Sequence, residues 1–158
     1  FIMEYKCQRL YRDARIFSIY EGTTQLQVVA AIRYITNGTY MGIIKEMLER
    51  EVSDEMKGLK DRVAAMAARL EEAVNIVKEA DNQDMQDFVA RRLYEMTADT
   101  LMSLLIIEDA TRAPELFSKS ANVYVRYAET EVEGHFSFIK NFKKEDIAYY
   151  RQTAATEE

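Results

Sequence analysis

The longest regular pattern in the chain is MKGLKDRVAAMAARLEEAVNIV, residues 56–77. Its apolar residues recur in alternating steps of three and four, which brings their side chains onto one face of an α-helix. These residues are Met56, Leu59, Val63, Met66, Leu70, Ala73 and Val77. The stretch therefore predicts a long helix with one buried seam, and polar Ser53-Asp54 offers its N-terminal cap.

Two further long helices are predicted downstream. Asp81-Asn82 interrupts the first pattern, and a second apolar face then begins. It consists of Met85, Val89, Leu93, Met96, Thr100 and Ile107, broadened by Leu101, Leu104 and Leu105. Pro114 suits the first turn of a third helix, because its missing N–H has no partner there in any case. The face of that helix is formed by Phe117, Ala121, Tyr124 and Ala128. We expect Gly134 to weaken or bend its end, and 147–151 to form a final short helix.

The predicted fold class is all-α. One proline and five glycines in 158 residues favour helices over a turn-rich β architecture. Short connections make neighbouring helices antiparallel, so three to four long helices would form an up-and-down bundle, with 39–50 as a short additional helix. The seam would also suit an intermolecular coiled coil, although a segment beside two others more often packs within its own domain.

Two amphipathic helices are predicted before the bundle, over residues 3–19 and over a segment that ends at Asn37-Gly38. Gly22 interrupts the pattern between them, and Thr23 or Thr24 can cap the second helix. The apolar positions of the first are Tyr5, Leu10, Ala14, Ile16 and Phe17. Those of the second are Leu26, Val29, Ala30 and Ile32.

Composition and charge argue against several kinds of function. A net charge of −6 and a pI near 5.0 oppose a general attraction to nucleic acid or to an anionic membrane. No stretch of 18 uncharged apolar residues suggests a membrane span. Cys7 and His135 are each the only residue of their type, so the sequence predicts neither an intramolecular disulfide nor a metal cluster, and the cytoplasm is the expected compartment.

One motif in the chain carries chemistry, the run RDARIFSIYEGTTQLQ at residues 12–27. It sets an acid, a glycine, two hydroxyls and two amides in a fixed order between two amphipathic segments. This run resembles the signature near the C-terminus of acyl-CoA dehydrogenases, where a helix, a tight turn and another helix meet at the flavin. The resemblance implies an FAD-dependent enzyme that oxidises an acyl-CoA thioester to the 2,3-enoyl-CoA, with electron-transfer flavoprotein as its redox partner.

Within the motif, the resemblance makes Glu21 the catalytic base that removes the α-proton. The other reading of Glu21 is an ordinary acid in a turn. Gly22 would let the backbone turn sharply and approach the substrate. Tyr20 would touch substrate or flavin, although an aromatic residue before a buried turn is more often a core anchor.

The residues after the glycine are assigned to ligands in the same way. Thr23 and Gln25 match positions that contact the flavin in the family, and Thr24 lies between them. Thr23 would in addition suit simple helix capping. Arg33, twelve positions after Glu21, matches an arginine associated with the bound CoA thioester.

The resemblance also divides the chain. Residues 1–36 would end the helical domain of the enzyme, 37–53 would form a connector that includes the short helix, and 54–158 would be a helical C-terminal extension. The start at Phe1 suits a piece of a longer protein, so we expect the chain alone to be inactive and to hold no FAD. The alternative function is a helical oligomerisation or protein-interaction module, and we expect a homo-oligomer.

Overall fold

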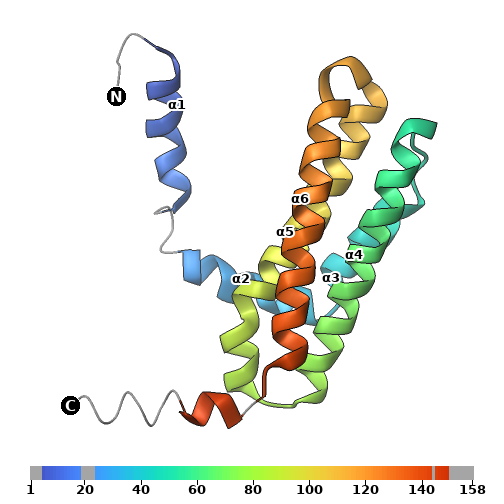
Figure 1. Cartoon of the computed structure of the whole chain (residues 1–158). Helices are drawn as coiled ribbons and strands as arrows, with labels where there is room; N and C mark the ends of the chain where they lie inside the picture. The colour runs from blue at the N-terminus through green and yellow to red at the C-terminus, as the bar shows by residue number, and fades with distance from the viewer. Residues whose placement is uncertain (1–4, 19–23, 144, 150–158) are drawn as a thin grey trace.

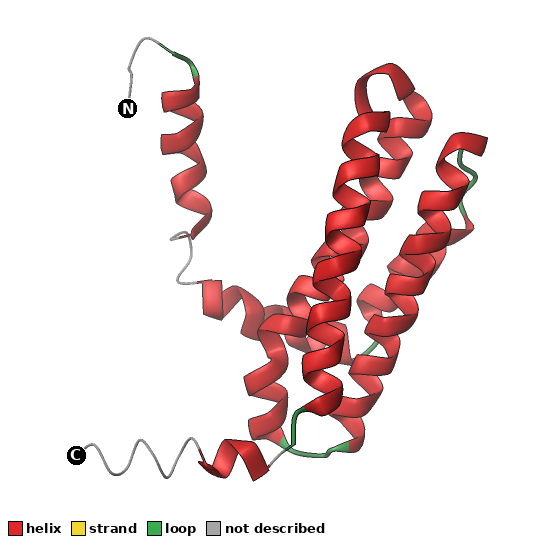
Figure 2. Cartoon of the chain, viewed as in Figure 1, coloured by secondary structure: helices red, strands yellow, loops and turns green. Residues whose placement is uncertain are grey.

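The computed structural model describes residues 5–18, 24–143 and 145–149, and every regular element in them is helical. Figure 1 shows their order along the chain, and Figure 2 shows that loops are confined to short connections. The elements are α1 (Cys7–Ala14), the 3-10 helix η1 (Arg15–Ser18), α2 (Thr24–Thr36), α3 (Thr39–Glu49), α4 (Asp54–Glu79), α5 (Gln83–Arg112) and α6 (Pro114–Asn141). Residues 145–149 form a further helical turn. The all-α prediction is confirmed.

Helices α4, α5 and α6 run down, up and down beside one another in the view of Figure 1 and form the body of the molecule. α3 lies against α4 and α5, while α2 packs chiefly across α5. Buried side chains from all five of these helices belong to one hydrophobic cluster. The segment from α2 to α6 therefore shares a single core, and α1 contributes no buried residue to it.

The seam predicted for residues 56–77 is confirmed, because all seven of its apolar side chains are buried. On α5 the predicted face is also buried, with two exceptions. Leu101 is only half-buried, and Leu105 is 46% exposed. On α6 the predicted Phe117 is 37% exposed, whereas four buried residues were missed. These are Val125, Val132, Phe136 and Ile139.

The long helices begin where the predicted capping residues and the proline placed their N-termini. Asn82 caps α5, its side-chain oxygen accepting a hydrogen bond from the backbone N–H of Met85 at 2.9 Å. Pro114 opens α6. Ser53 is the cap position of α4, but its side chain makes no capping hydrogen bond. α6 continues through Gly134 to Asn141, so this glycine does not end the helix, and its expected weakening or bending effect stays a prediction.

The turn between α2 and α3 requires a residue with positive φ. Gly38 supplies it with φ of 88°, a conformation that residues with a Cβ rarely adopt. The Asn37 side-chain oxygen accepts hydrogen bonds from the backbone N–H of Thr39 at 3.0 Å and from its hydroxyl at 2.7 Å. Asn37-Gly38 thus stops α2 as predicted and starts α3.

Candidate functional site

The centre of the predicted site falls in the connection between η1 and α2. η1 ends at Ser18 and α2 begins at Thr24. Tyr20, Glu21, Gly22 and Thr23 lie outside the described residues, so their roles stay predictions.

The described part of the motif begins at the N-terminus of α2. Thr24 is the first residue of the helix, Gln25 follows it, and both are exposed. Within the described segments, neither side chain makes a hydrogen bond to another residue. The first N–H groups of a helix also lack intrahelical partners, and they favour anionic groups such as phosphate. Free hydroxyl and amide groups at this position fit the phosphate, ribose or ring acceptors of a flavin nucleotide.

α2 positions this end of the motif through one buried face. Val28 is fully buried, and Ile32 and Ile35 are 7% and 3% exposed. Leu26 and Val29 are 55% and 53% exposed. The predicted helix is therefore confirmed, but most of its predicted apolar face is wrong.

α2 is fixed to α5 by Val28, Ile32 and Ile35, and it presents a second apolar face, with Leu26, Val29 and Ala30, away from the bundle. α1 is similar, because Leu10 is 68% exposed and no residue of this helix is buried. The predicted apolar positions Tyr5, Leu10, Ala14 and Ile16 are therefore exposed, and the side chain of Phe17 lies outside the described residues.

Arg33 lies on the outward side of α2, nine residues beyond Thr24 and therefore about 14 Å along the helix axis. Its guanidinium carbon is 5.8 Å from the centre of the Tyr34 ring. No carboxylate within the described segments forms an ion pair with it. It lines an open hollow of about 690 Å³ together with Lys78 of α4 and Gln86 of α5. An exposed, unpaired guanidinium at a hollow can bind an anionic group such as a phosphate.

A group of titratable residues that the sequence did not point to lies between α5 and α6. Tyr124 donates a hydrogen bond to Asp99 at 3.0 Å, and His135 Nε2 lies 3.1 Å from a carboxylate oxygen of Glu95. Burial raises the pKa of the Asp99 carboxyl above its usual value, although the bond from Tyr124 opposes this shift. Burial and the bond to Asp99 raise the pKa of Tyr124 to about 12. These residues join two helices of the core, and none belongs to the motif.

Among the described residues, no three His, Cys, Asp or Glu side chains lie together in a way that could hold a metal ion. Among the same residues, no helix combines the length and the apolar character needed to cross a membrane.

Comparison with known proteins gives three results. The family described as "Acyl-CoA dehydrogenase C terminal" matches residues 36–147. The crystal structure of an acyl-CoA dehydrogenase family protein from Porphyromonas gingivalis is similar, with a TM-score of 0.68 and 39% identity over 72% of this chain and 98% of that chain. The caffeyl-CoA reductase–Etf complex subunit CarC of Acetobacterium woodii is 63% identical over 27 residues.

The chain therefore belongs to the acyl-CoA dehydrogenase family, of which it carries a C-terminal portion. The family match begins at the last residue of α2 and includes α3, α4, α5 and α6. The match to the curated relative covers 17% of this chain and 7% of that protein.

Proposed function

We propose that the protein carrying this chain is an FAD-dependent acyl-CoA dehydrogenase that oxidises an acyl-CoA thioester to the 2,3-enoyl-CoA. The observation that carries the proposal is the run at residues 12–27, found in a chain of this family. The free side chains of Thr24 and Gln25 and the unpaired guanidinium of Arg33, all on α2, support it.

Glu21 is the proposed base. Removal of a proton from the carbon next to the thioester carbonyl requires a carboxylate within reach of that proton. Bound flavin would accept the β-hydride, so that one C–H bond on each carbon is broken and the double bond forms between them. Gly22 would let the backbone pass close to the thioester, and Tyr20 would pack on the substrate.

The other site residues are proposed to bind rather than to react. Thr23, Thr24 and Gln25 would donate and accept hydrogen bonds to the cofactor at the start of α2. Arg33 would pair with a phosphate of CoA. Because an interaction made equally with substrate and transition state changes KM rather than kcat, Arg33→Gln should raise KM for the acyl-CoA and leave kcat nearly unchanged. Arg126→Gln on α6 is the matched control.

Electron-transfer flavoprotein is the proposed redox partner. The subunit from Acetobacterium woodii is named as part of a reductase–Etf complex, which pairs a relative of this chain with such a protein. Its name describes a reductase, and the same base and flavin can run the reaction in either direction. The physiological direction for this chain is therefore proposed from the family alone.

The experiment that tests this function uses the whole flavoprotein under anaerobic conditions. Addition of an acyl-CoA should abolish the visible flavin absorbance, yield the 2,3-enoyl-CoA by mass spectrometry, and allow reoxidation by electron-transfer flavoprotein. A flavin that stays oxidised with acyl-CoAs of short, medium, long and aromatic chains would contradict the proposal.

The 158-residue chain by itself is proposed to be helical but inactive. α2–α6 share a core, whereas Thr24, Gln25 and Arg33 stand on an open surface. Circular dichroism should show a strongly helical protein, and incubation with FAD should leave it colourless. Stoichiometric flavin binding with acyl-CoA-dependent dye reduction by this chain alone would show that it is a complete enzyme.

Oligomerisation is a second proposed function, and α6 carries the observation that favours it. Leu116, Val123 and Tyr127 are 68%, 70% and 56% exposed, and their steps of seven and four place them along one side of the helix. Light scattering after size exclusion should show a dimer or larger assembly that Val123→Asp dissociates. A monomer for the unmodified chain and for the intact protein would exclude this role.

A further inference from the structure

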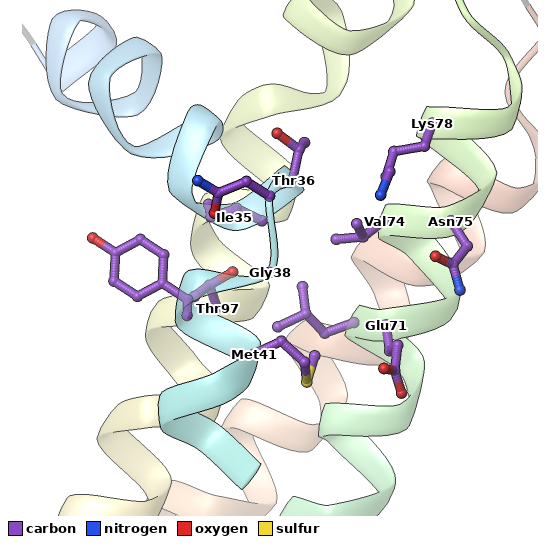
Figure 3. Close-up of a pocket in the computed structure, with 12 residues that line it drawn as sticks. Ile35, Thr36, Gly38, Met41, Glu71, Val74, Asn75, Lys78 and Thr97 are labelled. Atoms are coloured by element: carbon purple, nitrogen blue, oxygen red, sulfur yellow. The ribbon is translucent and has the colours of Figure 1, made fainter. Parts of the chain in front are cut away.

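A cavity of about 170 Å³ lies between the α2–α3 turn and α4, with α5 behind it. Figure 3 shows its lining, with Ile35 and Thr36 at the end of α2, Met41 on α3 and Val74 and Lys78 on α4. None of these residues belongs to the motif at residues 12–27.

The floor of the cavity is apolar. Ile35 and Leu70 are 3% and 1% exposed, and Met41 and Val74 are half-buried beside them. An apolar protein cavity of about 150 Å³ is large enough to hold a benzene molecule. The space therefore fits a six-carbon ring or a short alkyl chain of similar volume.

The mouth of the cavity carries an unpaired positive charge. Lys78 extends from α4 toward the α2–α3 turn (Figure 3), and it has no ion-pair partner within the described segments. Glu71 lies at the same mouth, but its carboxylate is 2.7 Å from the ammonium of Lys45. The nearby Asp81 lines the neighbouring hollow without pairing with Lys78.

Two amide groups at the mouth can add hydrogen bonds. Asn75 makes none to another residue within the described part of the chain. The Asn37 oxygen is occupied by Thr39, which leaves its amide N–H groups to donate. The mouth therefore offers one cation and several N–H donors above an apolar floor, which is the complement of a carboxylate joined to a small hydrocarbon.

We propose that this cavity is a binding site for a small carboxylate with an apolar part of about six carbons, such as hexanoate or benzoate. The carboxylate binds Lys78 and Asn75, and the hydrocarbon occupies the space between Ile35, Leu70 and Val74. A ligand there contacts both the end of α2 and α4, so its binding stabilises the packing of α2 against the bundle.

The test titrates the 158-residue chain with hexanoate and benzoate, and separately with hexanol and benzyl alcohol, by two-dimensional NMR of its backbone amides. Both carboxylates should give saturable shifts around Gly38, Met41 and Val74. Because hydrogen bonds to charged groups are stronger than neutral ones, the carboxylates should bind about tenfold more tightly than the alcohols. Equal affinity for the acids and the alcohols, or shifts that do not saturate, would overturn the proposal.

Three variants separate the contribution of the Lys78 charge to binding from that of the apolar cavity. Lys78→Gln should weaken carboxylate binding about tenfold, to the level of the alcohols. Lys119→Gln removes the same charge from an exposed position on α6 and should change nothing. Val74→Phe fills the cavity and should abolish binding of acids and alcohols alike while the circular dichroism spectrum stays helical. If Val74→Phe does not fold, the Lys78 and Lys119 pair still decides, because carboxylate binding that both variants retain would place the ligand elsewhere.

Discussion

Adjacent valines on α2 allow a direct test of which face of this helix holds it to the bundle. Val28 is fully buried and Val29 is 53% exposed. Val28→Ala removes two carbons from the core, at about 0.8 kcal/mol each, and leaves a small cavity behind. Alanine regains about 0.5 kcal/mol of helix propensity. The free energy of unfolding should therefore fall by about 1–2 kcal/mol.

Val29→Ala is the matched control, because it makes the same chemical change one residue away. Only about half of that side chain is buried, so the lost burial and the gained helix propensity nearly cancel, and the change should stay within about 0.5 kcal/mol. Urea unfolding of the 158-residue chain, followed by circular dichroism, gives both values. An equal effect at the two positions, or a larger one at Val29, would refute the assignment of the buried face.

Two other predictions concern the interior of the bundle and the α2–α3 turn. Burial raises the pKa of the Asp99 carboxyl above its usual value of 3.8, so folding favours the protonated form of this group. Its protonation therefore stabilises the folded chain at low pH, and this stabilisation is lost as the pH rises from about 3.8 through the raised pKa. Asp99→Asn has no such loss, so in urea titrations its stability relative to the unmodified chain should increase as the pH rises from about 3.8 through the raised pKa of Asp99; a pH-independent difference would contradict the shift. Gly38→Ala should destabilise the chain by about 1 kcal/mol, because its φ is +88°, whereas Gly42→Ala inside α3 meets nothing within 4 Å and should stabilise it by about 0.5–1 kcal/mol. Thermal melts showing the same sign for both glycine variants would contradict that account of the turn.

The long helices could be predicted from the sequence because each carries apolar residues mainly on one side. The seam from Met56 to Val77 allows only one helix orientation, and Asn82 and Pro114 fix where the next helices begin. The local chemistry of a cap or of a first-turn proline depends on a few neighbouring residues, so it can be recognised without the tertiary structure.

The orientation of α2 could not be predicted in the same way. Its sequence is apolar on both sides, with Val28, Ile32 and Ile35 on one and Leu26 and Val29 on the other. Periodicity alone cannot say which of two apolar faces meets the core, since that depends on the partner helix. α5 is that partner.

Contacts between residues far apart in the chain could not be predicted from the sequence either. Asp99 and Tyr124 are 25 positions apart, and the bond between them depends on how α5 packs on α6. The cavity beside Lys78 likewise requires the end of α2, the start of α3 and the end of α4 to come together. By contrast, the roles proposed for the motif residues Tyr20 to Thr23 come from the sequence resemblance and not from the structure.

The proposed role of Glu21 as the base of a flavin-dependent dehydrogenase is tested most directly by rapid mixing of the whole flavoprotein with a saturating acyl-CoA. Glu21→Gln keeps the shape of the side chain and removes its basicity, so the variant should fold, retain its flavin and lose flavin absorbance at least about a hundredfold more slowly. Loss of flavin absorbance at the unmodified rate by a flavin-replete Glu21→Gln protein would contradict the account.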